Sequence, residues 1–253
     1  ARQTAGATGE ALVRGPWERA GEEALALRAQ ASARLGRGQA GEALRSALRA
    51  LSLLRELGDR REEAPTMCLI ARLHMERGEL EEAAEAGRRA EELYRQLSDG
   101  EGEASVLLDV VCRVQSLRGE PGLALLAAKE AAALFAASGS PSREASAVEE
   151  AAGHHLLRGE PRAALHLLEN ASARLRGREA RTDGGRSHEL LADGLQLAAA
   201  RAHLLLGDVG AALAAAEASL AAFQALSDAR RGAAALCCLA EAHLAAGRGQ
   251  RAA

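Results

Sequence analysis

Six glycines recur along this chain at nearly constant spacing, and no other feature limits its fold so strongly. They are Gly38, Gly78, Gly119, Gly159, Gly207 and Gly247. Successive members lie 40, 41, 40, 48 and 40 residues apart. In two copies the glycine stands within the same four residues, Arg118–Pro121 and Arg158–Pro161. A period of this length indicates a repeat protein whose units are helical hairpins, and the one long interval indicates an insertion.

Small residues occupy fixed columns relative to these glycines. Five residues after each glycine stands an alanine, namely Ala43, Ala83, Ala124, Ala164, Ala212 and Ala252. Seven residues before the glycine, alanine recurs in every copy but the third, where Cys112 stands. Small side chains in register let helix backbones approach closely. The segments between turns have helical apolar spacing and none alternates like a strand, so we expect an all-α chain.

The composition argues against several classes of function. A net charge of −3 gives no basic footprint for nucleic acid, and aromatic residues at 2% favour an alanine- and leucine-rich helical core. No apolar run approaches about 18 residues, so no membrane insertion is expected. The four cysteines, Cys68, Cys112, Cys237 and Cys238, show no paired C-x-x-C spacing and no small disulfide framework. We expect buried free thiols and favour an intracellular, reducing compartment.

The glycine register divides most of the chain into hairpins. The predicted units are about 16–57, 58–98, 99–139, 140–185 and 186–226, followed by a truncated unit at 227–253. Residues 1–15 are expected to be flexible or the tail of a preceding repeat. The long interval maps to a polar, glycine-containing loop at 177–185. Both ends of the sequence look cut, so we expect a piece of a longer protein.

These columns resemble tetratricopeptide (TPR) repeats of the subclass with a period near 40 residues. The resemblance covers residues 16–253, and Leu57–Arg60 is similar to the segment that joins units in that subclass. It implies a right-handed α-solenoid superhelix of stacked antiparallel hairpins, whose first helices line a concave groove. The lysine and asparagine clamp and the groove asparagines of two TPR families are missing. Neither family's ligand is therefore carried over.

Histidine and cysteine positions raise a metal site as an alternative. One column, four residues before the glycine, contains His74, His155, His203 and His243, and Cys237, Cys238 and His243 form a weak second grouping. We interpret the column as packing between hairpins, with imidazole in place of an aromatic ring, and predict no metal and no cofactor. The motifs G-x-S-x-G, P-loop and H-E-x-x-H are absent, so we predict no enzyme.

The candidate binding residues stand six positions before the glycines, in a column that the resemblance places in the groove. Arg72, Arg113 and Arg201 are expected there to contact an acidic ligand. For Arg72 and Arg113 the alternative is a surface helix pair, with Glu76 and Asp109 respectively, whereas Arg201 has no such neighbour. Apolar contacts are expected from Leu69, Met75, Val110, Leu156 and Leu204.

The predicted function is a non-catalytic protein–protein interaction scaffold that binds a peptide or helix in its concave groove. The partner is expected to be an acidic or amphipathic protein or peptide. Two alternatives stay open. In the first alternative, the chain is the sensor or oligomerisation segment of a larger regulator, of the ATPase type or a transcriptional one. In the second, it is a structural subunit of a large assembly and makes its contacts through the convex second helices.

Overall fold

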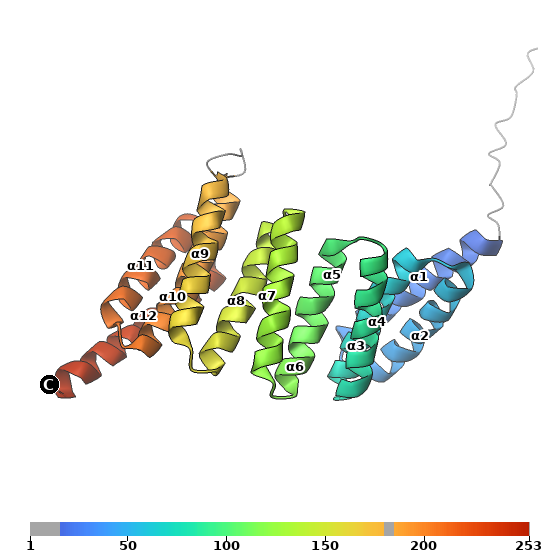
Figure 1. The fold of residues 1–253 in the computed structure, drawn as a ribbon, viewed down its shortest axis with the longest axis horizontal. Helices are drawn as coiled ribbons and strands as arrows, with labels where there is room; N and C mark the ends of the chain where they lie inside the picture. The colour runs from blue at the N-terminus through green and yellow to red at the C-terminus, as the bar shows by residue number, and fades with distance from the viewer. Residues whose placement is uncertain (1–15, 180–184, 253) are drawn as a thin grey trace, which may run out of the picture.

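The computed structural model describes residues 16–179 and 185–252, and these form a row of helices standing side by side (Figure 1). The helices are α1 (Pro16–Leu35), α2 (Ala40–Leu57), α3 (Arg60–Glu76), α4 (Leu80–Gln96), α5 (Gly100–Val106), the π-helix η1 (Leu107–Cys112), α6 (Arg113–Leu117), α7 (Pro121–Ser138), α8 (Pro141–Leu157), α9 (Pro161–Glu179), α10 (Gly185–Leu206), α11 (Val209–Ala225) and α12 (Ala229–Ala252). The described ranges contain no strand. The predicted all-α solenoid of stacked antiparallel hairpins is confirmed.

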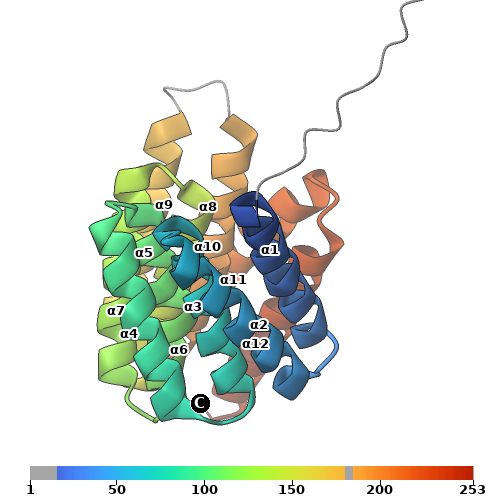
Figure 2. The same cartoon turned by 90° about the vertical axis from the view of Figure 1, so that its right-hand side faces the viewer.

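Along the chain the helices alternate between first and second members of hairpins, and Figure 2 looks along the row that they form. The first helices are α1, α3, the continuous α5–η1–α6, α8, α10 and α12, and their exposed side is called here the first-helix face. The second helices are α2, α4, α7, α9 and α11, and their exposed side is the second-helix face. Neighbouring first helices contact one another, as in α1 with α3, α8 with α10 and α10 with α12.

Turn residues with left-handed backbone recur every twenty positions. They are Gly38, Gly58, Gly78, Ser98, Gly119, Gly139, Gly159, Gly207 and Ser227, with φ between 55° and 78°. Turns within hairpins and turns between hairpins thus share one geometry, which favours glycine because it has no Cβ. The spacing fails twice: 21 residues separate Ser98 from Gly119, and 48 separate Gly159 from Gly207.

The extra residue between Ser98 and Gly119 is accommodated by η1. A π-helix closes its hydrogen bonds one residue later than an α-helix, so it holds an inserted residue without breaking the helix. When hairpins two and three are aligned at their turns, Asp109 is the residue without a counterpart in α3. The 41-residue interval in the sequence is therefore a helical bulge and not a longer loop.

Alanine columns and large helix-end residues build the core. The alanines five residues after each turn glycine are fully buried wherever the structure describes their side chains, as at Ala43, Ala124 and Ala212. Large residues such as Phe135 and Phe223 fill the spaces at the helix ends and are also fully buried. Close helix approach thus comes from alanine, and the larger side chains fill the space that remains at the helix ends.

Two sequence predictions on helix ends need correction. The expected turn at Gly247 is wrong, because α12 continues through it to Ala252. Among the described residues no further helix packs against this part of α12, and such packing is what stabilises a helical hairpin. The expected loop at 177–185 is also too long, because α9 extends through Gly177 to Glu179. The expectation for residues 1–15 and the centre of that loop, 180–184, lie outside the described residues.

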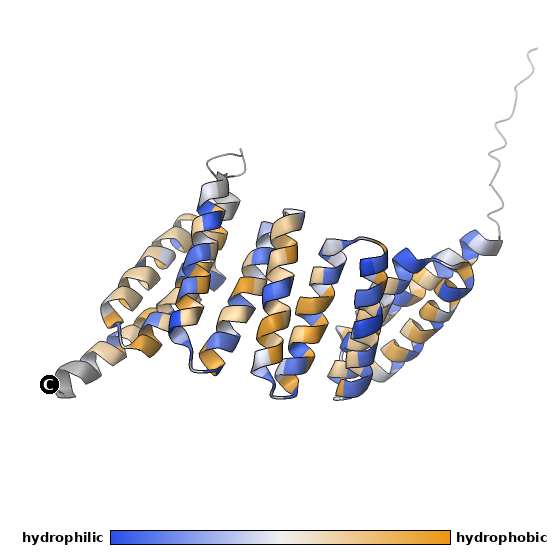
Figure 3. Cartoon of the chain, in the orientation of Figure 1, coloured by the Kyte–Doolittle hydropathy of each residue, from blue (hydrophilic) through white to orange (hydrophobic). Residues whose placement is uncertain are grey.

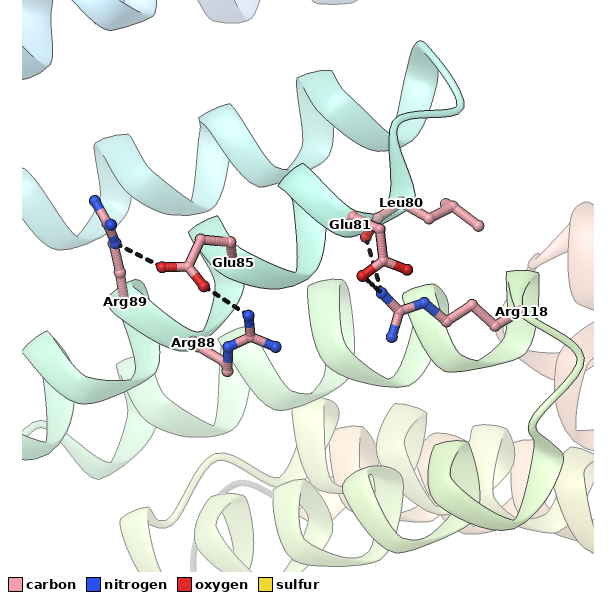
Figure 4. A network of polar contacts seen from close by, with 6 residues as sticks. All are labelled: Leu80, Glu81, Glu85, Arg88, Arg89 and Arg118. Atoms are coloured by element: carbon pink, nitrogen blue, oxygen red, sulfur yellow. Dashed lines mark hydrogen bonds and ion pairs between the residues drawn. The ribbon is translucent and has the colours of Figure 1, made fainter.

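The second-helix face changes character along the row (Figure 3). On α4, Glu85 accepts hydrogen bonds from Arg88 at 2.6 Å and Arg89 at 2.9 Å, and Arg118 reaches Glu81 at 2.9 Å (Figure 4). By contrast, α7 is the one helix in the described ranges that is long and apolar enough to cross a membrane. The search of the sequence for uninterrupted apolar runs did not single it out, because Lys129 and Glu130 interrupt it. It nevertheless packs within the stack, where it contacts α5, η1 and α8.

Candidate functional site

A hollow in the first-helix face lies between α1, α3 and η1, and we call it the N-terminal groove pocket. Its volume is about 430 Å³, and its lining includes Leu25, Arg28, Leu69, Arg72, Tyr94, Asp109 and Val110. Leu69 and Val110 are buried and form an apolar floor, whereas Arg72 is exposed. Three predicted site residues from two different helices therefore meet in one pocket.

The pocket combines charge with buried polar groups. Arg28 forms an ion pair with Glu62 at 2.5 Å, so its charge is partly neutralised. Arg72 forms no ion pair with any described residue, and the helix pair with Glu76 that sequence offered is not formed. Burial raises the pKa of the Cys68 thiol to about 12 and also raises the pKa of the neighbouring Tyr94 hydroxyl. Both groups are therefore neutral at physiological pH and offer hydrogen bonds without charge.

A second hollow, which we call the central groove pocket, lies between η1, α6 and α8. Its volume is about 680 Å³, and its lining includes Asp109, Arg113, Ser116, Leu117, Arg143, Glu149 and Glu150. Asp109 borders both pockets, because the bulge in η1 places it between them. It pairs with Arg143 of α8 at 2.8 Å, and the Arg143 guanidinium lies 5.0 Å from the Phe135 ring centre.

The remaining predicted site residues are more scattered. Arg113 is exposed, and the alternative raised for it, a helix pair with Asp109, is not formed. Asp109 pairs with Arg143 instead, because the π turn disturbs the i, i+4 alignment. Arg201 is exposed and borders neither pocket. Met75, Leu156 and Leu204 are half-buried, pack against the core and line neither of the two pockets.

Sequence reasoning missed several pocket residues, among them Arg28, Tyr94, Asp109 and Arg143. Only Asp109 had a signal in the sequence, namely the single 41-residue interval. Glu149 was missed too. Its pKa is raised by burial, an effect opposed by the nearby charges of Arg231 and Arg201. The charge of Arg201 therefore lowers the pKa of a carboxyl group on the neighbouring helix α8, although Arg201 has no charged partner one turn away in its own helix.

Two histidines of the column contact the acidic residue after the turn glycine, whereas His203 Nδ1 lies 4.0 Å from Asp208 and His243 is exposed. The interpretation of the column as packing between hairpins stays a prediction. His74 Nδ1 lies 2.7 Å from Glu79 Oε2, and His155 Nδ1 lies 2.7 Å from Glu160 Oε2. The weak grouping at Cys237, Cys238 and His243 does not gather into a metal-ligating set in the described residues. Cys237 is exposed and Cys68 is only partly buried, so the expectation of four buried thiols is wrong for these two.

A different polar cluster lies where η1 and α6 meet α8. His154 Nε2 is 3.3 Å from Cys112 Sγ and 3.2 Å from Ser116 Oγ, and the Glu150 carboxylate stands within 4.8 Å of both the thiol and the imidazole. Burial raises the pKa of Cys112 to about 11 and lowers the pKa of His154. Both groups are therefore neutral, and the cluster contains one charge, on the exposed Glu150.

No protein-family profile and no curated protein matches this sequence. Solved structures do match the fold. A Podosopora anserina protein described as a kinesin light chain with nearly identical TPR-like repeats has a TM-score of 0.65 at 18% identity, over 83% of this chain and 98% of that chain.

Two further structures with a similar fold are those of a signal transduction ATPase and of a Rap protein. The Pyrococcus horikoshii Signal Transduction ATPase with Numerous Domains (STAND), which has a tetratricopeptide repeat sensor, gives a TM-score of 0.66 at 16% identity, over 90% of this chain and 34% of that chain. A Rap protein complexed with Competence and Sporulation Factor gives 0.58 at 16% identity, over 91% of this chain and 65% of that chain. The chain therefore has the fold of tetratricopeptide repeat proteins.

Proposed function

We propose that this chain is a non-catalytic protein-interaction scaffold that holds a peptide or helix along its first-helix face. The observation that carries the proposal is the N-terminal groove pocket, where Leu69, Arg72 and Val110 converge. These residues come from helices α3 and η1, so only the stacked array brings them together. A hollow lined by apolar residues with a few convergent polar groups is the usual form of a binding site.

The chemistry of the pocket favours an amphipathic ligand with an acidic group. The apolar floor offers burial to one face of a helix or to alternate side chains of an extended peptide. Arg72 offers an unpaired guanidinium, which binds carboxylates through two parallel hydrogen bonds. Asp109 adds an acceptor at the boundary with the central groove pocket. The Rap protein with this fold is itself a complex with a factor, which supports a binding role.

The test is selection from a pooled library of amphipathic helical peptides that carry acidic residues, followed by affinity measurements. Arg72→Glu and Arg113→Glu are expected to weaken the selected peptides about tenfold or more, because each reverses a charge in the groove. Arg88→Glu is the matched control, since Arg88 is equally charged and exposed but lies on α4. Arg201→Glu reports whether the ligand extends beyond the two pockets.

Two results would contradict the proposal. One is binding that survives both groove reversals unchanged. The other is an equal loss of affinity in Arg88→Glu, which would indicate a nonspecific effect of net charge or a site on the second-helix face. The latter outcome would favour the structural-subunit alternative, which uses that face.

The second candidate function is the sensor segment of a larger regulator. The observation that favours it is the likeness to the STAND protein with its repeat sensor, of which this chain covers 34%. The sequence that encodes the neighbouring parts of the protein decides between the two. A P-loop or a helix-turn-helix motif in the same reading frame would support the regulator.

A further inference from the structure

Four polar residues interrupt columns that are otherwise apolar in the repeat register. At the position of His154 the other five copies carry alanine, leucine or valine, and at the position of Cys112 they carry alanine. At the position of Glu150 the other copies carry alanine, leucine, valine or cysteine, and at that of Ser116 they carry leucine or methionine. The other copies therefore show what packing alone requires at these positions. All four exceptions fall at one interface, between hairpins three and four.

The four exceptions converge in space. Glu150 and His154 are one turn apart on α8, and Cys112 and Ser116 are one turn apart on η1 and α6. His154 Nε2 points at the other pair, 3.3 Å from Cys112 Sγ and 3.2 Å from Ser116 Oγ. The Ser116 hydroxyl already donates to the Cys112 carbonyl at 2.9 Å. Sulfur, nitrogen and carboxylate donors thus surround one point.

A purely structural role leaves this cluster unexplained. His154 is 4% exposed, and its Nδ1 is buried without a hydrogen-bond partner in the described part of the chain. An unsatisfied buried polar atom destabilises a fold, so alanine or valine would pack better there. The same interface also contains η1, and π-helical segments are frequent at functional sites. These costs are offset if the cluster binds something.

We propose that Cys112, Glu150 and His154 form a zinc site, with the thiolate, a carboxylate oxygen and Nε2 as ligands. A thiolate, an imidazole and a carboxylate are the donors that Zn²⁺ takes in proteins. Tetrahedral bonds of about 2.3 Å to sulfur and 2.0–2.1 Å to nitrogen put the two donor atoms about 3.5 Å apart. Cys112 Sγ and His154 Nε2 are already 3.3 Å apart, so little movement is needed.

Binding involves one proton and no redox change. The Cys112 thiol releases its proton to solvent as the sulfur–metal bond forms, and His154 and Glu150 donate lone pairs. Ser116 and Glu150 also line the central groove pocket, so the fourth coordination position faces that pocket. Three protein ligands and one open position leave room for water or for a donor group from a groove ligand.

The test is titration of the reduced, metal-free chain with Co²⁺, which reports a thiolate ligand by a charge-transfer absorption band, followed by displacement with Zn²⁺. We expect one metal per chain. Cys112→Ala should abolish the band, and His154→Ala and Glu150→Ala should each weaken binding about tenfold or more. Alanine stands at these positions in other copies, so these variants are expected to fold. Cys238→Ala is the matched control, because Cys238 is also a buried thiol on a first helix.

Thermal unfolding gives an independent readout. Zn²⁺ should raise the unfolding temperature of the natural chain and of Cys238→Ala, and should leave Cys112→Ala and Cys112→Ser unchanged, because a ligand stabilises only the state that binds it. The proposal is overturned if the folded natural chain gives no charge-transfer band. It is equally overturned if the band persists in Cys112→Ala. Neither result depends on whether a peptide binds in the groove.

Discussion

His74 Nδ1 lies 2.7 Å from Glu79 Oε2, across the turn in which Gly78 has a φ of 76°. The backbone N–H of Glu79 also donates to the His74 carbonyl, at 2.9 Å. Two hydrogen bonds therefore join the end of α3 to the start of α4. The acidic residue after the turn glycine, which looks in sequence like an ordinary solvated charge, is part of the turn itself.

This contact predicts how stability changes with acid. The hydrogen bond with His74 is the main cause that lowers the pKa of Glu79 below 4.5, and Arg77 lowers it further. A carboxyl group with a lower pKa in the folded state stabilises the fold above its unfolded pKa, and this contribution is lost as the pH falls through the folded pKa. We expect Glu79→Gln to lower the urea midpoint at pH 7 and to flatten its decline below about pH 5.

The control for this prediction is Glu217→Gln, which removes an exposed carboxylate on α11 that has no ion pair in the described residues. Urea unfolding followed by circular dichroism at several pH values provides the measurement. If Glu79→Gln and Glu217→Gln gave the same acid profile, the histidine contact would have no role in stability.

The π-helix predicts an unusual tolerance to deletion. Removing Asp109 restores twenty residues between the turns at Ser98 and Gly119 and lets η1 continue as an α-helix. The unfolding temperature is expected to stay close to that of the natural chain. Deleting Leu69 from α3 should instead rotate half of that helix by about 100° and expose its core side, at a cost of about 3 kcal/mol or more. Helicity and thermal unfolding of both deletions check this, and equal damage would argue against the bulge.

Two nearby glycines predict opposite responses to alanine. A Cβ on Gly102 would lie 2.2 Å from the Tyr94 ring, whereas one on Gly100 would meet nothing within 4 Å. Gly102→Ala is expected to destabilise the fold by about 1–3 kcal/mol, because the ring must move within a packed interface. Gly100→Ala should be neutral or slightly stabilising, since alanine restricts the unfolded chain. Denaturant unfolding of the pair distinguishes crowding from loss of glycine flexibility.

Thiol chemistry provides a further prediction. Cys237 is exposed, Cys112 and Cys238 are buried, and burial raises the pKa of Cys68 to about 12. The thiolate is the reactive form, so one thiol should react rapidly with a chromogenic disulfide near pH 8 and three should react only on unfolding. Cys237→Ser should abolish the rapid phase. A second rapid thiol in that variant would contradict the packing around α3, η1 or α12.

Much of the fold could be predicted because its determinants are local. Glycine at Gly119 and alanine at Ala124 follow from the turn and from close helix approach, so the register predicts the hairpins. Cys237 and the helical path through Gly247 could not be predicted in the same way. Whether a residue is exposed, or whether a turn forms, depends there on which helix packs against it.

The candidate site was predicted less completely. Arg72 and Leu69 could be found because the repeat register assigns them to one face. Asp109 and Arg143 form their pair across two hairpins, so neither is visible from spacing within one helix. The cluster at Cys112 and His154 combines residues 42 positions apart. In the sequence, only comparison of the copies with one another reveals it, because each residue alone is compatible with an ordinary buried position in the core.

The single extra residue in η1 has a consequence for the register in which a long ligand would bind. A groove built from identical units presents the same contacts at every step, so an extended ligand can bind in several registers of nearly equal energy. An irregular interface removes that equivalence, because Asp109 and its neighbours occur once in the row. The bulge thus favours a single binding register for any ligand that spans it.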